Sequence, residues 1–138
     1  TGNDPHEIAS IKKVLDQSFT IKDLGLIKYF LGLEITRTSE GIFLNQKKYV
    51  HDLLVATKME NCDPVLFPLP KGLKLSTVEG DLLSDPEAYR KIIGKLLYLN
   101  MTRPDISFAV HHLSQFMNTP RLPHYHAAIH VIKYLLSP

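Results

Sequence analysis

Prolines limit the fold of this 138-residue chain more than any other feature, because proline has no backbone donor and cannot continue a helix or a central strand. Three prolines and two glycines fall between residues 61 and 84: Pro64, Pro68, Pro70, Gly72 and Gly80. They exclude a long regular element there, so we expect a linker or an extended strap along the surface. This segment divides the chain into residues 1–60 and residues 85–138.

Apolar residues at helical spacing predict five helices. Two of them open with Asp-Pro and a nearby glutamate, as Asp4-Pro5-His6-Glu7 and Asp85-Pro86-Glu87, in which the aspartate caps the helix and the proline suits its first turn. The expected spans are about residues 5–18, 45–58, 86–100, 106–116 and 124–136. Short proline turns join the last three, so residues 85–138 predict a self-contained three-helix bundle.

A β-hairpin is expected between the first two helices. Apolar and polar residues alternate over residues 27–36, which predicts one strand with Tyr29 and Leu33 on one face and Phe30 and Glu34 on the other. A polar turn then returns the chain as a short partner strand. A lone hairpin does not hold a core, so this part needs helices or outside strands over its apolar face. The expected fold class is α+β: a β-hairpin packed with helices, followed by the helical bundle.

Charge is divided unevenly along the chain. Residues 1–84 carry 10 Lys and Arg against 11 Asp and Glu, a net charge of −1, whereas residues 85–138 carry 6 against 3, a net charge of +3. The second part is therefore the better candidate for an anionic partner. No apolar run approaches the roughly 20 residues of a membrane-spanning helix. With Cys62 as the only cysteine, we expect an intracellular protein of the cytoplasm or nucleus, without membrane contact.

Five segments follow one another in a specific order. They are Asp23-Leu24-Gly25, Tyr29-Phe30-Leu31-Gly32-Leu33-Glu34-Ile35, Ile93-Gly94-Lys95-Leu96-Leu97-Tyr98-Leu99, Thr102-Arg103-Pro104-Asp105-Ile106-Ser107-Phe108-Ala109-Val110 and Leu113-Ser114-Gln115-Phe116-Met117. Together they resemble the C-terminal half of the Ty1/copia-type reverse transcriptase of long-terminal-repeat retrotransposons. The resemblance spans nearly the whole chain.

The resemblance implies part of an RNA-directed DNA polymerase that uses a pair of carboxylate-held metal ions. In the family, the Tyr-x-Asp-Asp hairpin directly precedes a Thr-Gly like Thr1-Gly2, so we expect no catalytic residue in this chain, which alone would be inactive. Mg²⁺ is implied only for the intact enzyme. Residues 1–60 would be the end of the palm, residues 61–84 a proline-rich linker and residues 85–138 the thumb and connection. The implied partners are an RNA or DNA primer-template and the remaining fingers, palm and ribonuclease H.

By the same resemblance, the segment Phe30, Leu31, Gly32, Leu33 and Glu34 corresponds to the primer grip, which steadies the primer terminus. A glycine inside a strand allows close approach of a ligand backbone. The alternative is that Gly32 only relieves crowding in a hairpin and that Glu34 is a solvated side chain.

Three basic residues of the second part are candidate contacts for nucleic acid. Lys91 and Lys95 lie four residues apart on one helix edge and suit phosphate contacts that do not read sequence. Arg103 stands at a helix start that could face a phosphate. A solvated helix flank and an ordinary helix start are the competing interpretations.

No metal site is expected. His126 and His130 have i, i+4 spacing, but no third ligand supports a zinc site, and His130 stands where the family has a basic residue. Asp52, Glu60 and Asp63 do not form an opposed carboxylate pair. No serine or cysteine nucleophile has an evident base. The alternative function is a non-catalytic retroelement relic or a recruited protein-interaction module.

Overall fold

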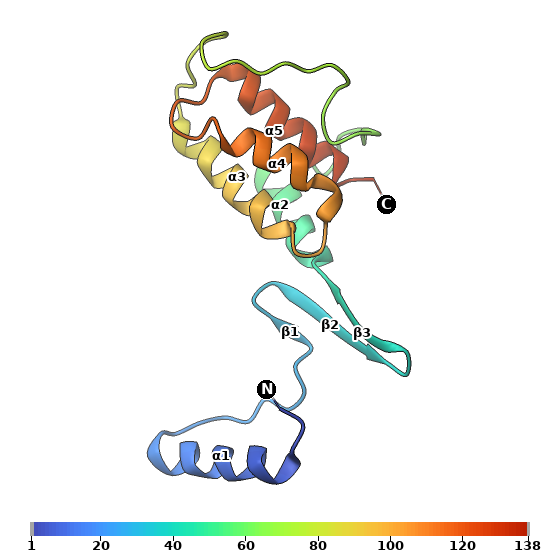
Figure 1. Cartoon of the computed structure of the whole chain (residues 1–138), viewed down its shortest axis with the longest axis vertical. Coiled ribbons are helices and arrows are strands. Elements are labelled where there is room, and N and C mark those ends of the chain that lie inside the picture. The colour runs from blue at the N-terminus through green and yellow to red at the C-terminus, as the bar shows by residue number, and fades with distance from the viewer. Residues whose placement is uncertain (1, 138) are drawn as a thin grey trace.

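A computed structural model describes residues 2–137 of the chain. Figure 1 shows an isolated helix at one end, a small sheet in the middle and a compact group of helices at the other end. The elements in order are α1 (Pro5–Ser18), β1 (Tyr29–Phe30), β2 (Leu33–Thr38), β3 (Gly41–Asn45), α2 (Lys47–Thr57), α3 (Pro86–Leu99), the 3-10 turn η1 (Pro104–Ile106), α4 (Ser107–Ser114) and α5 (Leu122–Tyr134). The expected α+β class is confirmed.

The expected helix starts are confirmed where capping chemistry marks them. Asp4 Oδ1 accepts from His6 N at 2.9 Å, and Asp85 Oδ1 accepts from Ala88 N at 3.1 Å. The helix over residues 5–18 matches its prediction, and the others begin or end within about two residues of theirs. None of the helices in the described part of the chain is long and apolar enough to cross a membrane.

The sheet differs from the predicted hairpin by one extra turn. The chain reverses at Leu31 and Gly32, whose φ angles are 51° and 77°, so that Tyr29 pairs with Glu34 and Phe30 with Leu33. The prediction of one strand over residues 27–36 was therefore wrong. The predicted placement of Tyr29 and Glu34 on opposite faces of the strand was also wrong, because residues directly opposite in an antiparallel pair share a face. A two-residue turn with positive φ at both positions matches the twist of a hairpin, and β3 completes the order β1-β2-β3.

The N-terminal elements have few tertiary contacts of their own. No residue of α1 is buried, and its apolar Ile11, Val14 and Leu15 are exposed. Large apolar side chains of the sheet, including Phe30 and Phe43, are also exposed. Helix α1 and the sheet do not cover each other (Figure 1). The expectation that the hairpin needs covering from elsewhere is consistent with this arrangement.

The core lies in a helical unit formed by α2, α3, α4 and α5. Residues of all four helices, among them Ile93, Val110 and Val131, belong to one buried cluster. Leu53 and Leu54 of α2 belong to it as well. The predicted three-helix bundle was incomplete, because the apolar stripe of α2 packs against the later helices and not against the sheet alone.

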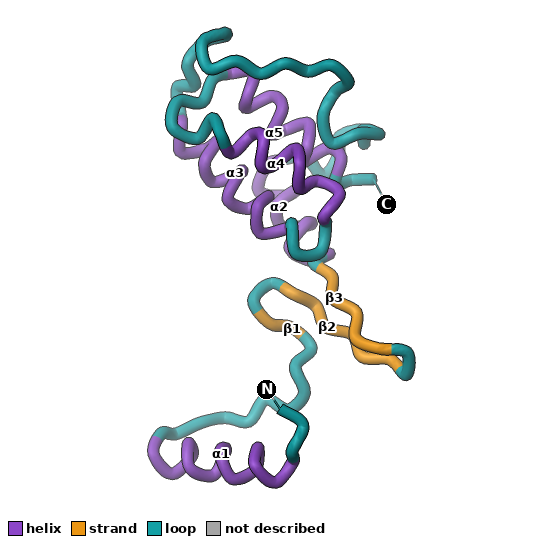
Figure 2. Tube along the Cα trace, in the orientation of Figure 1, coloured by secondary structure: helices purple, strands orange, loops and turns teal. Residues whose placement is uncertain are grey.

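Residues 61–84 form an extended strap, one of the two predicted alternatives. Apart from the bridge between Leu82 and Arg121, the described residues of this segment form no strand or helix. Figure 2 shows the strap running along the helical unit. Side chains of α5 and its ends hold it: Arg121 donates to Thr77 O at 2.8 Å, and Ser137 donates to Val65 O at 3.0 Å.

Candidate nucleic-acid interface

The predicted primer-grip segment forms the β1–β2 turn, and this turn rests on the helical unit. A Cβ atom at Gly32 would lie 3.2 Å from Tyr98 Cε1 and 3.5 Å from Tyr49 Cδ2. The rings of Tyr49 on α2 and Tyr98 on α3 lie 5.2 Å apart between centroids. Gly32 therefore provides both a positive φ and the space for Tyr98, and this internal contact accounts for the glycine without a ligand.

The other residues of this segment are placed differently from one another. Phe30 and Leu31 are exposed, and Leu33 is half-buried. Glu34 Oε1 accepts from Lys48 N at 3.1 Å, so this carboxylate caps the first turn of α2. Glu34, a solvated side chain in the alternative interpretation, is half-buried and links the sheet to α2.

Lys91 and Lys95 lie on one exposed edge of α3. Tyr98 follows them at the i, i+7 position from Lys91, so the three side chains form a stripe, called here the α3 stripe, about 10 Å long along the helix axis. Because Gly32 contacts Tyr98, the β1–β2 turn stands at one end of this stripe. The structure thus brings the predicted primer-grip segment and the two predicted lysines to the same side of α3.

Sequence reasoning missed a third lysine at this surface. Lys58, the left-handed C-cap of α2, lines with Lys91 and Lys95 a hollow of about 300 Å³ between α2 and α3. None of these three lysines forms an ion pair with any residue between 2 and 137. Lys58 lies 33 residues before Lys91, and only the antiparallel packing of α2 on α3 reveals it.

Arg103 lies apart from this surface and is already paired. Its guanidinium donates through Nε and Nη2 to Asp105, with Nη2 to Oδ2 at 2.8 Å, and lies 5.5 Å from the ring centroid of Tyr134. Hydrogen bonding to Asp105 raises the pKa of Arg103, and the same contact lowers the pKa of Asp105. Arg103 and Asp105, which flank Pro104 at this helix start, therefore pair with each other.

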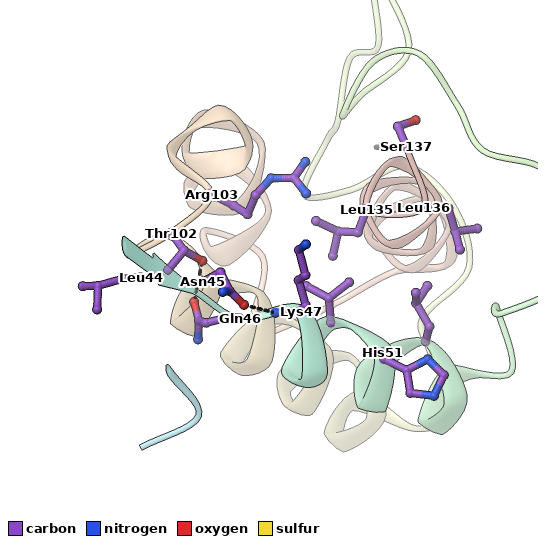
Figure 3. A pocket seen from close by; sticks show the side chains of 12 residues that line it. Leu44, Asn45, Gln46, Lys47, His51, Thr102, Arg103, Leu135, Leu136 and Ser137 are labelled. Carbon is purple, nitrogen blue, oxygen red and sulfur yellow. Dashed lines mark hydrogen bonds between the residues drawn. The ribbon is translucent and has the colours of Figure 1, made fainter. Parts of the chain in front are cut away.

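Arg103 lines a second hollow, of about 440 Å³, between the start of α2 and the end of α5 (Figure 3). Figure 3 shows the Lys47 amine and the Arg103 guanidinium directed toward this space. At its edge the buried Gln46 accepts from Thr102 Oγ1 at 2.8 Å, while its Nε2 has no partner among the described residues. The lining of this hollow combines aliphatic side chains, such as Leu44 and Leu135, with polar ones, such as Asn45 and His51.

The buried His124 has a structural role. His124 is fully buried: its Nδ1 accepts from Arg121 N, and its Nε2 therefore donates to Ser76 O, each at 2.9 Å. Burial lowers the pKa of His124. Sequence reasoning missed this role, and it missed Arg121, because both contact the strap more than 40 residues away.

The other histidine and acidic candidates are separate from one another. His130 Nε2 lies 3.2 Å from Phe67 O of the strap, and Asp52 pairs with Lys48 at 2.9 Å. Among residues 2–137, no three His, Cys, Asp or Glu side chains lie together in a way that could hold a metal ion.

Comparison with known proteins identifies the family. Residues 1–71 match the family model described as reverse transcriptase (RNA-dependent DNA polymerase). The chain is 44% identical over 135 residues to the retrovirus-related Pol polyprotein from transposon RE1 of Arabidopsis thaliana, which covers 98% of this chain and 9% of the polyprotein. It is 39% identical over 145 residues to the corresponding polyprotein from transposon TNT 1-94 of Nicotiana tabacum, with 97% and 11% covered.

A shorter relative is the uncharacterized mitochondrial protein AtMg00810 of Arabidopsis thaliana, 40% identical over 121 residues, which cover 88% of this chain and 50% of that protein. No solved structure matches the chain. The chain thus spans about a tenth of the two polyproteins and half of the mitochondrial relative. From the matched model and these relatives, the chain belongs to the reverse transcriptase family of copia-type retrotransposon Pol polyproteins.

Proposed function

We propose that this chain supplies part of the primer-template binding surface of a copia-type reverse transcriptase, without supplying its catalytic metal site. In this proposal, residues 1–60 are the end of the palm, residues 61–84 a connecting strap and residues 85–138 the thumb and connection. Helix α2 joins the first and last parts, since Glu34 of the sheet caps it and its Leu53 and Leu54 are buried in the helical core.

The observation that carries the proposal is the contact of Gly32 with Tyr98. Through this contact the β1–β2 turn, proposed as the primer grip, adjoins the α3 stripe with Lys91 and Lys95. A duplex lying along the stripe would meet lysines first and then the exposed Phe30 and Leu31 of the turn.

The chemistry of this surface suits a backbone contact. Lys58, Lys91 and Lys95 are exposed and have no ion-pair partner in the described range, so their charges are available to phosphates. Flexible lysines neutralise phosphates as point charges and do not read bases. Such binding would be independent of sequence and strongly dependent on salt, as a polymerase that copies any template requires.

The acidic residues present do not fit a pair of magnesium ions. Two-metal chemistry needs opposed carboxylates around ions about 4 Å apart, and between residues 2 and 137 no three His, Cys, Asp or Glu side chains lie together in a way that could hold a metal ion. Asp52 and Asp105, both candidates by residue type, are held by Lys48 and Arg103. In the proposal, magnesium and the catalytic aspartates belong to another part of the polymerase.

The exposed sheet and α1 support the remaining polymerase as a protein partner. Apolar side chains on both elements face solvent, including Val14 and Phe43. A three-stranded sheet with an uncovered apolar face gains stability when another element packs on it, at roughly 25 cal/mol for each Å² of apolar surface removed from water. This face suits further strands or helices of the palm.

A fluorescence-anisotropy titration tests the proposal. The full chain is titrated into a labelled DNA primer-template at a series of salt concentrations, and the expected result is binding that weakens steeply as salt rises. Absent or salt-insensitive binding would instead support a protein-interaction module or a relic without nucleic-acid binding.

A further inference from the structure

A hollow of about 520 Å³ lies between the strap and α4, away from the α3 stripe. Its lining includes Phe67 and Lys71 of the strap and Phe108 and His112 of α4. This volume is within the range of sites that hold small organic ligands. Neither the primer grip nor the lysine surface accounts for it.

The side of this hollow formed by α4 is an aromatic platform. Phe108 is 82% exposed, and its ring is parallel to that of His112 within 4°, with 6.2 Å between centroids. His112 meets the edge of the buried Phe116 at 5.7 Å, and Phe116 stacks on the buried His124 at 4.0 Å. The exposed ring is thus the outer end of a row of rings that reaches into the core.

The charge around the hollow favours an anion. The strap segment 64–78 contains Lys71 and Lys74 and no acidic residue. The one carboxylate of the lining belongs to Asp105, which Arg103 already neutralises at 2.8 Å. A flat aromatic face beside an unopposed cation matches a nucleotide, whose base stacks and whose phosphate carries the negative charge.

We propose that this hollow binds a nucleotide of single-stranded nucleic acid, with its base stacked on Phe108 and its phosphate near Lys71. The inference rests on the proposed function, since it gives the chain a second contact with the same polymer: the duplex lies on the α3 stripe and an unpaired strand reaches α4. An exposed base is needed for stacking, so a paired duplex does not use this site.

The test measures the affinity of the full chain for a labelled 12-nucleotide single strand by fluorescence anisotropy. Phe108→Ala should weaken binding at least about fivefold, because stacking of one base on an aromatic side chain contributes roughly 1–3 kcal/mol. Phe108→Tyr should retain the affinity, whereas Phe108→Leu, which keeps the apolar surface and loses the ring, should not. Phe19→Ala, which removes an exposed phenylalanine of the N-terminal part, is the matched control and should bind normally.

An abasic strand of the same length separates stacking from charge. The expected result is that Phe108→Ala and the unaltered chain bind the abasic strand equally. Unchanged affinity of Phe108→Ala for the normal strand, or full retention of affinity by Phe108→Leu, would overturn the inference. The proposed function is judged separately, by duplex binding, which Phe108→Ala should leave unchanged and Lys91→Gln with Lys95→Gln should weaken.

Discussion

Replacing Lys91 and Lys95 together with glutamine should remove two phosphate contacts while leaving the fold intact. Both side chains are exposed on α3, and neither forms an ion pair with the residues from 2 to 137, so the free energy of unfolding should change little. For B-form DNA, each neutralised phosphate contributes about 0.9 to the slope of log affinity against log salt. The double substitution should therefore lower the magnitude of this slope by about 1.8.

This change in slope has a measurable size. Between 50 and 200 mM salt, a fourfold increase, a slope of 1.8 corresponds to a factor of about 12 in affinity. The unaltered chain should thus lose about 12 times more affinity across this range than the variant does. Anisotropy titrations of a DNA primer-template at four salt concentrations give both slopes.

The control removes the same charge from another part of the chain. Lys13→Gln with Lys22→Gln alters two exposed lysines outside the helical unit, and it should leave the slope nearly unchanged. If this control lowers the slope as much as the α3 variant does, binding depends on net charge alone and the assignment of the α3 stripe is refuted. An unaltered slope in the α3 variant refutes it equally.

Three further substitutions, two of them paired with a control substitution, test the internal contacts. Gly32→Ala should lower the free energy of unfolding by about 1–2 kcal/mol in urea denaturation, because it forces a Cβ into a positive-φ position against a ring. By contrast, the added Cβ of Gly94→Ala would meet no atom within 4 Å, so this substitution should raise the free energy of unfolding by about 0.5–1 kcal/mol. Equal effects of the two glycine substitutions would contradict the account. In the folded chain the pKa of His124 lies below its ordinary 6.5. The unfolded chain therefore binds more protons, and the free energy of unfolding should fall as pH drops below about 6.5. His124→Asn should flatten this pH dependence, and an unchanged dependence would exclude His124 as its source. Arg121→Gln loses donors to two strap carbonyls and should speed tryptic cleavage of the strap, whereas Arg37→Gln, on the sheet, should not.

Local chemistry allowed most of the helices to be predicted. Asp4 and Asp85 cap the helices that follow them through bonds spanning two or three residues, and such bonds are visible in the sequence. The family motifs likewise pointed to Gly32, and the spacing of four residues on a predicted helix pointed to Lys91 and Lys95, before their positions were known. These features depend on neighbours within a few residues.

The features that were missed depend on long-range packing or on an unusual backbone. The turn at Leu31 was hidden because leucine gives no signal of a positive φ, and the alternating pattern continued through it. The packing of Leu53 into the helical core could not be predicted, because the sequence of an apolar stripe does not indicate which element will pack against it. The strap contacts of Arg121 and His124 join residues that are 41 to 48 positions apart in the sequence, so no local sequence pattern predicts them.

The position of bound nucleic acid tests the central claim most directly. Amide chemical-shift changes in nuclear magnetic resonance spectra of the labelled chain, recorded while a DNA primer-template is added, locate the contact residue by residue. The account predicts changes at the β1–β2 turn, at Lys58 and along α3 from Lys91 to Tyr98, with the face of α5 under the strap unaffected. Changes confined to α1 and the sheet, or no changes at all, would contradict it.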